Sequence, residues 1–233
     1  MPNIENLNAV QLDALQETGN IGCSHAATAV SNMVSKPVEI SVPDIKIKRM
    51  DELRDTLKTF SDKHDKVVGV YLELTNEFLG SILFVFPYTS ALALADILLS
   101  QPIGTSKDLD EMGQSAIMEV GNVVVSAYTN ALGKFLNTTI MLSPPSYACD
   151  VPDGVLENIT KNIGKETTHA LVFNTTFNEE NNLFKSYFIL LPSPKSLDIL
   201  LDKLSSCLTQ NQDEETKKYL CSLSKNSGNN TNG

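Results

Sequence analysis

An internal repeat at a shift of 102 residues is the feature that most limits how this chain can fold. The stretch DALQETGNIGCS is matched in substance, about a hundred residues later, by SAIMEVGNVVVS. One register gives seven identical pairs: Glu17 and Glu119, Gly19 and Gly121, Asn20 and Asn122, Ser24 and Ser126, Ala29 and Ala131, Ser41 and Ser143, Pro43 and Pro145. A single register held over so many pairs predicts two copies of one structural unit.

Both copies have the same predicted order of elements. Downstream of the repeated segment each half carries two β-rich runs, KVVGVYLEL with FLGSILFVFP in the first and HALVFNTTF with LFKSYFILLP in the second, which is typical of hairpins. Apolar residues at helical spacing follow Pro87 and Pro192. Each half is therefore predicted to be helix, strand, insertion, hairpin, helix. The expected fold is α+β, with an internal duplication and two pseudo-symmetric halves.

The repeat also predicts the domain organisation. We expect one domain over residues 1–208, with repeat 1 at about 5–100 and repeat 2 at about 108–208. Residues 209–233 are poor in large apolar side chains and end in Asn, Gly, Ser and Thr. Such a composition cannot join a packed core, so this segment is predicted to be a disordered polar tail.

Composition and charge argue against several classes of function. With 42% hydrophobic residues among 233, the chain can bury a sizeable core. A formal net charge of −10 argues against binding to nucleic acid or to an anionic membrane, because clustered Lys and Arg bind both. No apolar run reaches the roughly 18 residues of a membrane span, and the start MPNIENLNAV has no signal-peptide pattern. We therefore expect no membrane insertion and a cytoplasmic location.

The cysteine and histidine spacings argue against a metal site and against a disulfide framework. The four cysteines lie far apart in the sequence and form no CxxC pair. None of the three histidines shares a helical or hairpin spacing with another candidate ligand. We therefore expect reduced cysteines, and neither a metal nor a cofactor held by this chain.

Each repeated segment predicts a long helix with a polar stripe. At about 100° per residue, Glu17 and Asn20 fall on the side opposite the apolar residues of the first helix. Glu119 and Asn122 do the same in the second helix. Residues at i and i+3 are neighbours on a helix surface. A carboxylate and an amide are thus predicted to point the same way in both halves.

Two interpretations of these stripes are open. They can be the solvated faces of amphipathic helices, and the glycines beside them can serve close helix packing. However, Asn is a mediocre helix former and Gly costs about 1 kcal/mol relative to Ala in a helix interior, yet both recur. Asp13 and Ser115 recur in the same stripes. Ile21 and Val123 add an apolar rim beside the glutamates, and such a mixed surface suits a protein partner.

The stripes resemble the signature of the CheC/CheX/FliY family of response-regulator phosphatases. That signature is Asp or Ser, three residues, Glu, two residues, Asn, and a Pro some way downstream. Both halves carry it, as Asp13, Glu17, Asn20 and Pro37 and as Ser115, Glu119, Asn122 and Pro144. The resemblance covers roughly residues 5–208, and the two signatures point to a CheC-type member.

The resemblance implies both the fold and the activity. It implies that the two signature helices lie on one face of a β-sheet, and that the chain removes phosphate from the aspartyl phosphate of phosphorylated CheY. Each Asn would orient water for in-line attack, each Glu would pair with the phosphate-site lysine of CheY, and the Mg²⁺ would belong to CheY. The implied catalytic residues are Glu17, Asn20, Glu119 and Asn122, supported by Asp13 and Ser115. The absence of a Ser-His-Asp set, a Cys-based phosphate loop and a Walker motif agrees with this chemistry.

A second partner implied by the resemblance is the receptor deamidase CheD. The insertion of the second half, residues 150–168, differs from its counterpart in the first half and is the expected docking surface. We name Asp150, Val155 and Leu156 as its contact residues. A helix that only covers a sheet edge would explain this insertion equally well. The alternative function is a non-enzymatic adaptor that binds phosphorylated CheY or CheD, and only phosphate release separates the two functions.

Overall fold

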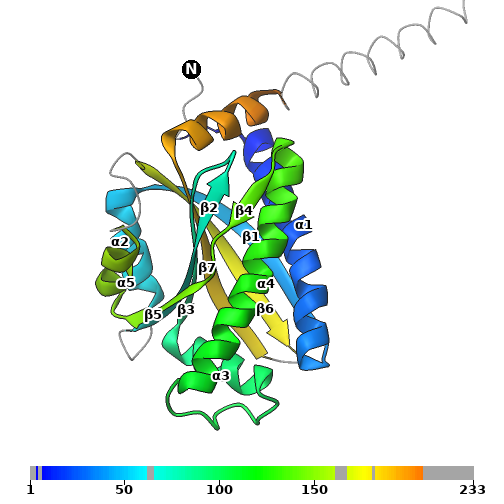
Figure 1. The fold of residues 1–233 in the computed structure, drawn as a ribbon, viewed down its shortest axis with the longest axis vertical. Helices are drawn as coiled ribbons and strands as arrows, with labels where there is room; N and C mark the ends of the chain where they lie inside the picture. Colours follow the sequence, from blue (N-terminus) through cyan, green and yellow to red (C-terminus); the bar gives the residue numbers. More distant parts are fainter. Residues whose placement is uncertain (1–3, 5–6, 62–65, 161–166, 180–181, 207–233) are drawn as a thin grey trace, which may run out of the picture.

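A seven-stranded sheet, antiparallel at every strand pair, organises the described part of the chain (Figure 1). The computed structural model describes residues 4, 7–61, 66–160, 167–179 and 182–206. The strands are β1 Val38–Arg49, β2 Val67–Asn76, β3 Gly80–Pro87, β4 Ile140–Leu142, β5 Ser146–Asp150, β6 His169–Glu179 and β7 Asn182–Pro192. The predicted tail, residues 209–233, lies outside the described residues, so its disorder stays a prediction.

The helices follow the order predicted for both halves. They are α1 Ala9–Val34, α2 Met50–Phe60, α3 Tyr88–Leu98, α4 Glu111–Leu136, α5 Pro152–Thr160 and a helix at residues 194–206. Asn8 and Asp110 cap the N-termini of α1 and α4, and both helices have 26 residues. Ser35 and Asn137 end them in the left-handed conformation. These boundaries agree with the repeat register. None of the described helices is long and apolar enough to span a bilayer.

The two long helices lie side by side on one face of the sheet and run in opposite directions (Figure 1). Side chains of α1, α3 and α4 form one core with this face, and those of α2 and α5 form a second core on the other. In β2, Val68 and Val70 belong to the first core, whereas Val67 and Tyr71 belong to the second, as strand alternation requires. The predicted α+β fold, with both signature helices on one face, is confirmed.

Strand pairing is exchanged between the halves. The sheet order is β1-β6-β7-β3-β2-β4, and β5 also pairs with β2. The first strand of the first half therefore pairs with the hairpin of the second half, while β4 and β5 pair with the hairpin of the first. If each strand is replaced by its counterpart in the other half, the same order results, read from the opposite edge of the sheet. Each half thus depends on the other for the partner of its edge strand.

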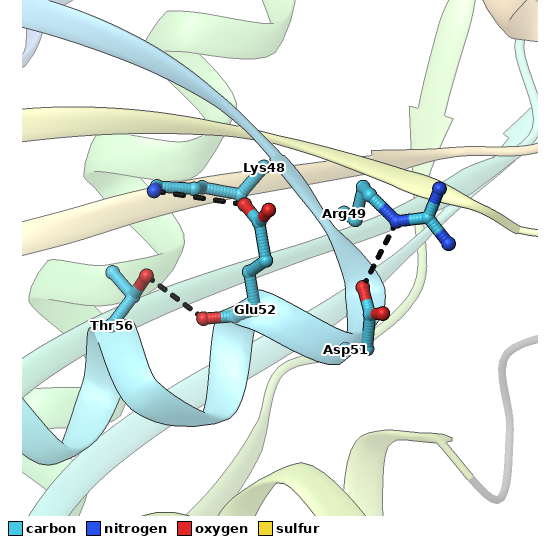
Figure 2. Close-up of polar contacts among 5 residues, drawn as sticks. All are labelled: Lys48, Arg49, Asp51, Glu52 and Thr56. Carbon is cyan, nitrogen blue, oxygen red and sulfur yellow. Dashed lines mark hydrogen bonds and ion pairs between the residues drawn. The ribbon is translucent and has the colours of Figure 1, made fainter.

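The junction of β1 and α2 carries exposed polar contacts. The Arg49 Nε lies 3.2 Å from the Asp51 carboxylate, and the Lys48 Nζ lies 3.6 Å from the Glu52 carboxylate (Figure 2). The Thr56 hydroxyl donates a hydrogen bond to the Glu52 backbone carbonyl at 3.1 Å. Exposed ion pairs contribute only about 0–1 kcal/mol each, so they orient this junction more than they stabilise it.

The insertions of the two halves, α2 and α5, pack together on the second face of the sheet. Arg54 and Lys58 of α2 lie 3.0 and 3.6 Å from the Asp153 carboxylate of α5. Leu53 and Leu57 are fully buried beneath them. Burial of two leucines contributes about 1.5–3 kcal/mol each, so the apolar contacts fix α2 and the charges align it with α5.

The contact between α1 and α4 depends on a glycine. A Cβ placed on Gly22 would lie 2.7 Å from the Cα of Tyr128, which is shorter than a normal carbon contact. A Cβ on Gly121 would lie 2.8 Å from the Val70 side chain of β2. Glycine therefore lets α1 approach α4 and lets α4 approach the sheet.

Of the two repeated glycines, Gly121 serves close packing, whereas a Cβ on Gly19 would lie 3.4 Å from Val42, an ordinary contact. Gly22 is not repeated, because Val124 stands at the matching position.

Replacing Gly22 with Ala is expected to lower stability, because the added methyl group would press on the backbone of α4. Overpacking of this kind costs about 1–3 kcal/mol, and each kcal/mol lowers the melting temperature by roughly 2–4 °C in a chain of this size. Ser24→Ala, on the exposed side of the same helix, is the control and should change stability by less than about 0.5 kcal/mol. Thermal unfolding followed by circular dichroism measures both. Equal melting temperatures would show that the helices separate without cost.

Candidate functional site

The acidic signature residues lie on the outer faces of α1 and α4. Glu17 and Glu119 are exposed, and neither forms an ion pair with another residue that the structure describes. Asp13 and Ser115 are exposed one turn earlier, and the Ser115 hydroxyl donates to the Glu111 backbone carbonyl at 2.8 Å. Each half thus presents a carboxylate that is available to a cation from outside the chain.

The two signature asparagines are both half-buried, but their hydrogen-bond environments differ. The Oδ1 of Asn20 accepts a hydrogen bond from the backbone N–H of Val42 at 3.0 Å. Val42 lies at a bulge in β1, where the pairing with β6 shifts register between Ser41 and Asp44. A residue in a β-bulge does not form the regular hydrogen bonds between strands. The Asn20 side chain therefore supplies the acceptor that the Val42 N–H needs.

Two more side chains of α1 hold the same strand. The Nε2 of Gln16 donates to the backbone carbonyls of Val42 and Pro43 at 3.1 and 2.9 Å. The Ser31 hydroxyl accepts from the Val38 N–H at 2.9 Å. β1 is the last strand at its end of the described sheet, so these contacts cover backbone groups that an edge would leave open. We call Gln16, Asn20 and Ser31, with the backbone groups of β1 that they bond, the β1 clasp.

The second half lacks an equivalent of the β1 clasp. The positions that match Gln16, Ser31 and Val42 are Met118, Gly133 and Pro144. Proline has no backbone N–H, so Pro144 cannot donate to Asn122 as Val42 donates to Asn20. The edge is interrupted here, because β4 ends at Leu142 and β5 begins at Ser146. The Asn122 side chain forms no hydrogen bond with the described residues, so its amide is available to a ligand or partner.

A cavity of 450 Å³ opens beside Asn122. Its lining residues are His25, Asn122, Val123, Ser126, Ala127, Asn130 and Lys134. All come from α4 except His25, which comes from α1. Imidazole, amide, hydroxyl and ammonium groups can all donate hydrogen bonds. None of the described residues that line this cavity is acidic. The arrangement suits an acceptor-rich or anionic group.

The described cysteines are poor nucleophiles. Burial raises the pKa of the Cys23 thiol to about 12. Burial also raises the pKa of the Cys149 thiol, although a hydrogen bond with Tyr147 and the charge of Lys66 act in the opposite direction. Both side chains are therefore protonated thiols near neutral pH, and a thiol is far less reactive than a thiolate. Among the described residues, no group of three or more His, Cys, Asp and Glu side chains is placed to hold a metal ion.

The remaining predicted contact residues divide into exposed and buried ones. Ile21 is 46% exposed on α1, and Val123 is half-buried at the cavity beside Asn122. Asp150 is exposed at the end of β5. Val155 and Leu156, however, are buried at 0% and 8% exposure in the second core. These two side chains thus lie in the core and not on the surface where the docking prediction placed them, because the apolar side of α5 packs on the sheet.

Sequence reasoning missed several residues of the site, among them Gln16 and His25. Gln16 acts on a strand 26 and 27 residues further along, and no local pattern marks such a contact. His25 had a usable signal, because the repeat pairs it with Ala127. A polar residue present in only one copy indicates a difference between the two halves. The signature consists of residues that are identical in the two repeats. His25 is marked instead by a difference between the repeats, because Ala127 stands at the matching position.

Comparison with known proteins finds one family that both halves of the chain resemble. The sequence model described as the CheC-like family matches residues 10–47 and 112–147. These segments cover α1 with most of β1, and α4 with β4 and the start of β5. They also begin in the repeat register. Both halves of the chain are therefore similar to the CheC-like family.

Relatives of this CheC-like chain include named phosphatases. The CheY-P phosphatase CheC of Bacillus subtilis is 27% identical over 202 residues, which cover 85% of this chain and 95% of CheC. The flagellar motor switch phosphatase FliY of the same organism is 25% identical over 146 residues, covering 62% of this chain but 37% of FliY. The crystal structure of Thermotoga maritima FliY has a TM-score of 0.68 and 22% identity, over 88% of this chain and 98% of that chain. The last match shows a shared fold.

The β1 clasp predicts unequal effects of removing the two asparagines. Asn20→Ala leaves the Val42 N–H without its acceptor, and a buried unsatisfied donor costs about 1–3 kcal/mol. Asn122→Ala is the matched control, because it removes the same atoms without breaking a described hydrogen bond. Asn20→Asp keeps an acceptor oxygen and is expected to recover most of the loss. Chemical denaturation measures all three variants. Equal unfolding midpoints for the two alanine variants would contradict the clasp.

Proposed function

We propose that this CheC-like chain removes phosphate from the aspartyl phosphate of a phosphorylated CheY-type response regulator. The observation that carries this proposal is the pair Glu119 and Asn122, which lie one turn apart on α4 and have no described polar partner. The relative named CheY-P phosphatase CheC aligns over 95% of its length and supports the same substrate class. A cytoplasmic location follows from this proposal, because response regulators act inside the cell.

The reaction requires no nucleophile from this chain. Water adds to the phosphorus atom, the bond from phosphorus to the aspartyl oxygen breaks, and the electron pair of that bond leaves with the carboxylate. The products are the free aspartate and inorganic phosphate, and the proton lost by the water passes to phosphate or solvent. An aspartyl phosphate is already reactive, so positioning and charge supply most of the acceleration. Polar side chains of the kind found on α4 can provide both.

The amide and the carboxylate are proposed to have different roles. An amide carries both donors and an acceptor, so Asn122 can hold the attacking water in one orientation. Asn20 can do so through its NH₂ group, which has no partner among the described residues. Glu17 and Glu119 are exposed and unpaired among the described residues, so either can accept a lysine of the regulator without losing an ion pair. The Mg²⁺ expected in this reaction belongs to the regulator, where it neutralises phosphoryl charge.

A non-enzymatic adaptor is the second candidate function. The β1 clasp favours it in part, because Asn20 has a structural role that explains its presence without catalysis. An adaptor and a phosphatase both bind the regulator. Release of inorganic phosphate from the phosphorylated regulator separates them, because only the phosphatase raises its rate above the spontaneous one.

Replacing Asn20 and Asn122 together with Ala is expected to lower single-turnover dephosphorylation by about 100-fold or more, which is the scale that positioning contributes. Affinity for a regulator activated with beryllium fluoride should change little, since this mimic of the phosphorylated state needs no attacking water. Stopped-flow phosphate release and calorimetry measure the two quantities on protein shown to be folded. Lost affinity with an unchanged single-turnover rate would assign the stripes to recognition.

Charge reversal of Glu17 and Glu119 to Lys is expected to act on binding instead. The lysine of the regulator would then face a like charge, and the affinity for the beryllium-fluoride-activated regulator should fall about tenfold or more. The control is Asp202→Lys, which makes the same charge change at an exposed position on the helix at residues 194–206. Equal affinities for the control and the double variant would remove the proposed lysine pairing.

We also propose that CheD docks beside α5 through Asp150. Asp150 is exposed, and its Oδ1 accepts a hydrogen bond from the Val151 N–H at 2.7 Å. Val151 is 45% exposed and extends this surface. Asp150→Lys is expected to weaken CheD binding, whereas Asp150→Asn keeps the acceptor and separates the loss of charge from damage to the turn. A folded Asp150→Lys protein that binds CheD with unaltered affinity would exclude this docking site.

A further inference from the structure

We propose that His25 of α1 completes the second site, by donating a hydrogen bond to a phosphoryl oxygen when Asn122 of α4 reaches the aspartyl phosphate of the regulator. The inference rests on the proposed phosphatase function and adds a residue outside the repeated signature. The second site is then built by both repeats, since its amide comes from one and its imidazole from the other.

The two sites differ in whether the amide oxygen of their asparagine already accepts a described hydrogen bond. The Oδ1 of Asn20 is occupied by the Val42 N–H at 3.0 Å, so orienting a water through that oxygen would require breaking the β1 clasp. Asn122 faces no such cost, because Pro144 stands at the position that matches Val42 and has no N–H. The site at Asn122 is therefore the one prepared to act on a phosphoryl group.

The cavity beside Asn122 is lined by hydrogen-bond donors. Ser126, Asn130 and Lys134 add donors to its lining, and no described lining residue carries a carboxylate. The chain as a whole has a formal net charge of −10, so a cavity lining without carboxylates repels an anion less than the acidic surface around it, where Glu119 lies one turn from Asn122. Lys134 lies twelve residues beyond Asn122, about 18 Å along α4, and so contributes to the potential and not to the phosphoryl contact itself.

His25 of α1 lies at this cavity. It is exposed, it lines the cavity from the opposite helix, and its imidazole forms no hydrogen bond with the described residues. Imidazole carries an N–H donor in both of its protonation states. The repeat places Ala127 at the matching position in α4, so the first site has a methyl group where the second has this donor. His25 is thus a donor that distinguishes the second site from the first.

His25→Ala is expected to lower single-turnover dephosphorylation of the phosphorylated regulator about tenfold or more, which is the effect of losing one hydrogen bond to a charged group. The melting temperature should stay the same, because the side chain is exposed. His25→Gln retains an N–H donor and is expected to recover part of the rate. Ser24→Ala is the matched control, since Ser24 is an exposed neighbour on α1 that does not line the cavity.

Double variants assign the effect to one site. His25→Ala should add no further loss to Asn122→Ala, but should reduce the rate of Asn20→Ala about as much as that of the unaltered protein, because only interacting residues show coupling. The inference is wrong if His25→Ala has the same rate as Ser24→Ala, or if it lowers the rate equally in both asparagine variants. An unaltered protein that releases phosphate no faster than the spontaneous rate would overturn the phosphatase function itself.

Discussion

The close packing of α1 on α4 is the contact on which the rest of the structure depends. It requires Gly22, because a Cβ there would lie 2.7 Å from the Cα of Tyr128. This approach places the two helices side by side over one core and leaves their polar stripes on the outer surface. It also brings His25 of one helix to the cavity beside Asn122 of the other. One backbone contact thus determines both the shape of the core and the composition of the candidate site.

The two ends of the sheet are protected by different means, and this difference carries over to the site. At one end, the β1 clasp satisfies backbone groups of β1 with side chains of α1. At the other end, Pro144 and Pro145 separate β4 from β5 and remove two N–H groups from the edge. The same signature residue therefore acts as part of the clasp in one half, whereas its amide in the other half has no hydrogen-bond partner among the described residues. Sequence identity between Asn20 and Asn122 does not imply identity of role.

Much of the fold was predictable from the sequence because its signals are local. The polar stripes follow from helical periodicity, and Asn8 and Asp110 mark helix starts that agree with the repeat register. The hairpins follow from β-rich runs joined by short connections that contain Asn and Glu. Two of the residues named for docking, Val155 and Leu156, are buried and do not lie on the surface. An apolar pattern on a short helix predicts that one side of the helix is buried. It does not show whether the sheet or a partner covers that side.

The sequence by itself determined the repeat, the helical character of α1 and α4, and the carboxylate and amide that share one side of each helix. The repeat is read directly from the residues, and the helical properties depend on residues within one or two turns of each other. Only the tertiary structure decided that the strands exchange between the halves, that Asn20 is held by Val42, and that His25 lies at the cavity of Asn122. Each of these results joins segments far apart in the chain. Their geometry is fixed by close packing of helices on the sheet, which no local sequence pattern encodes.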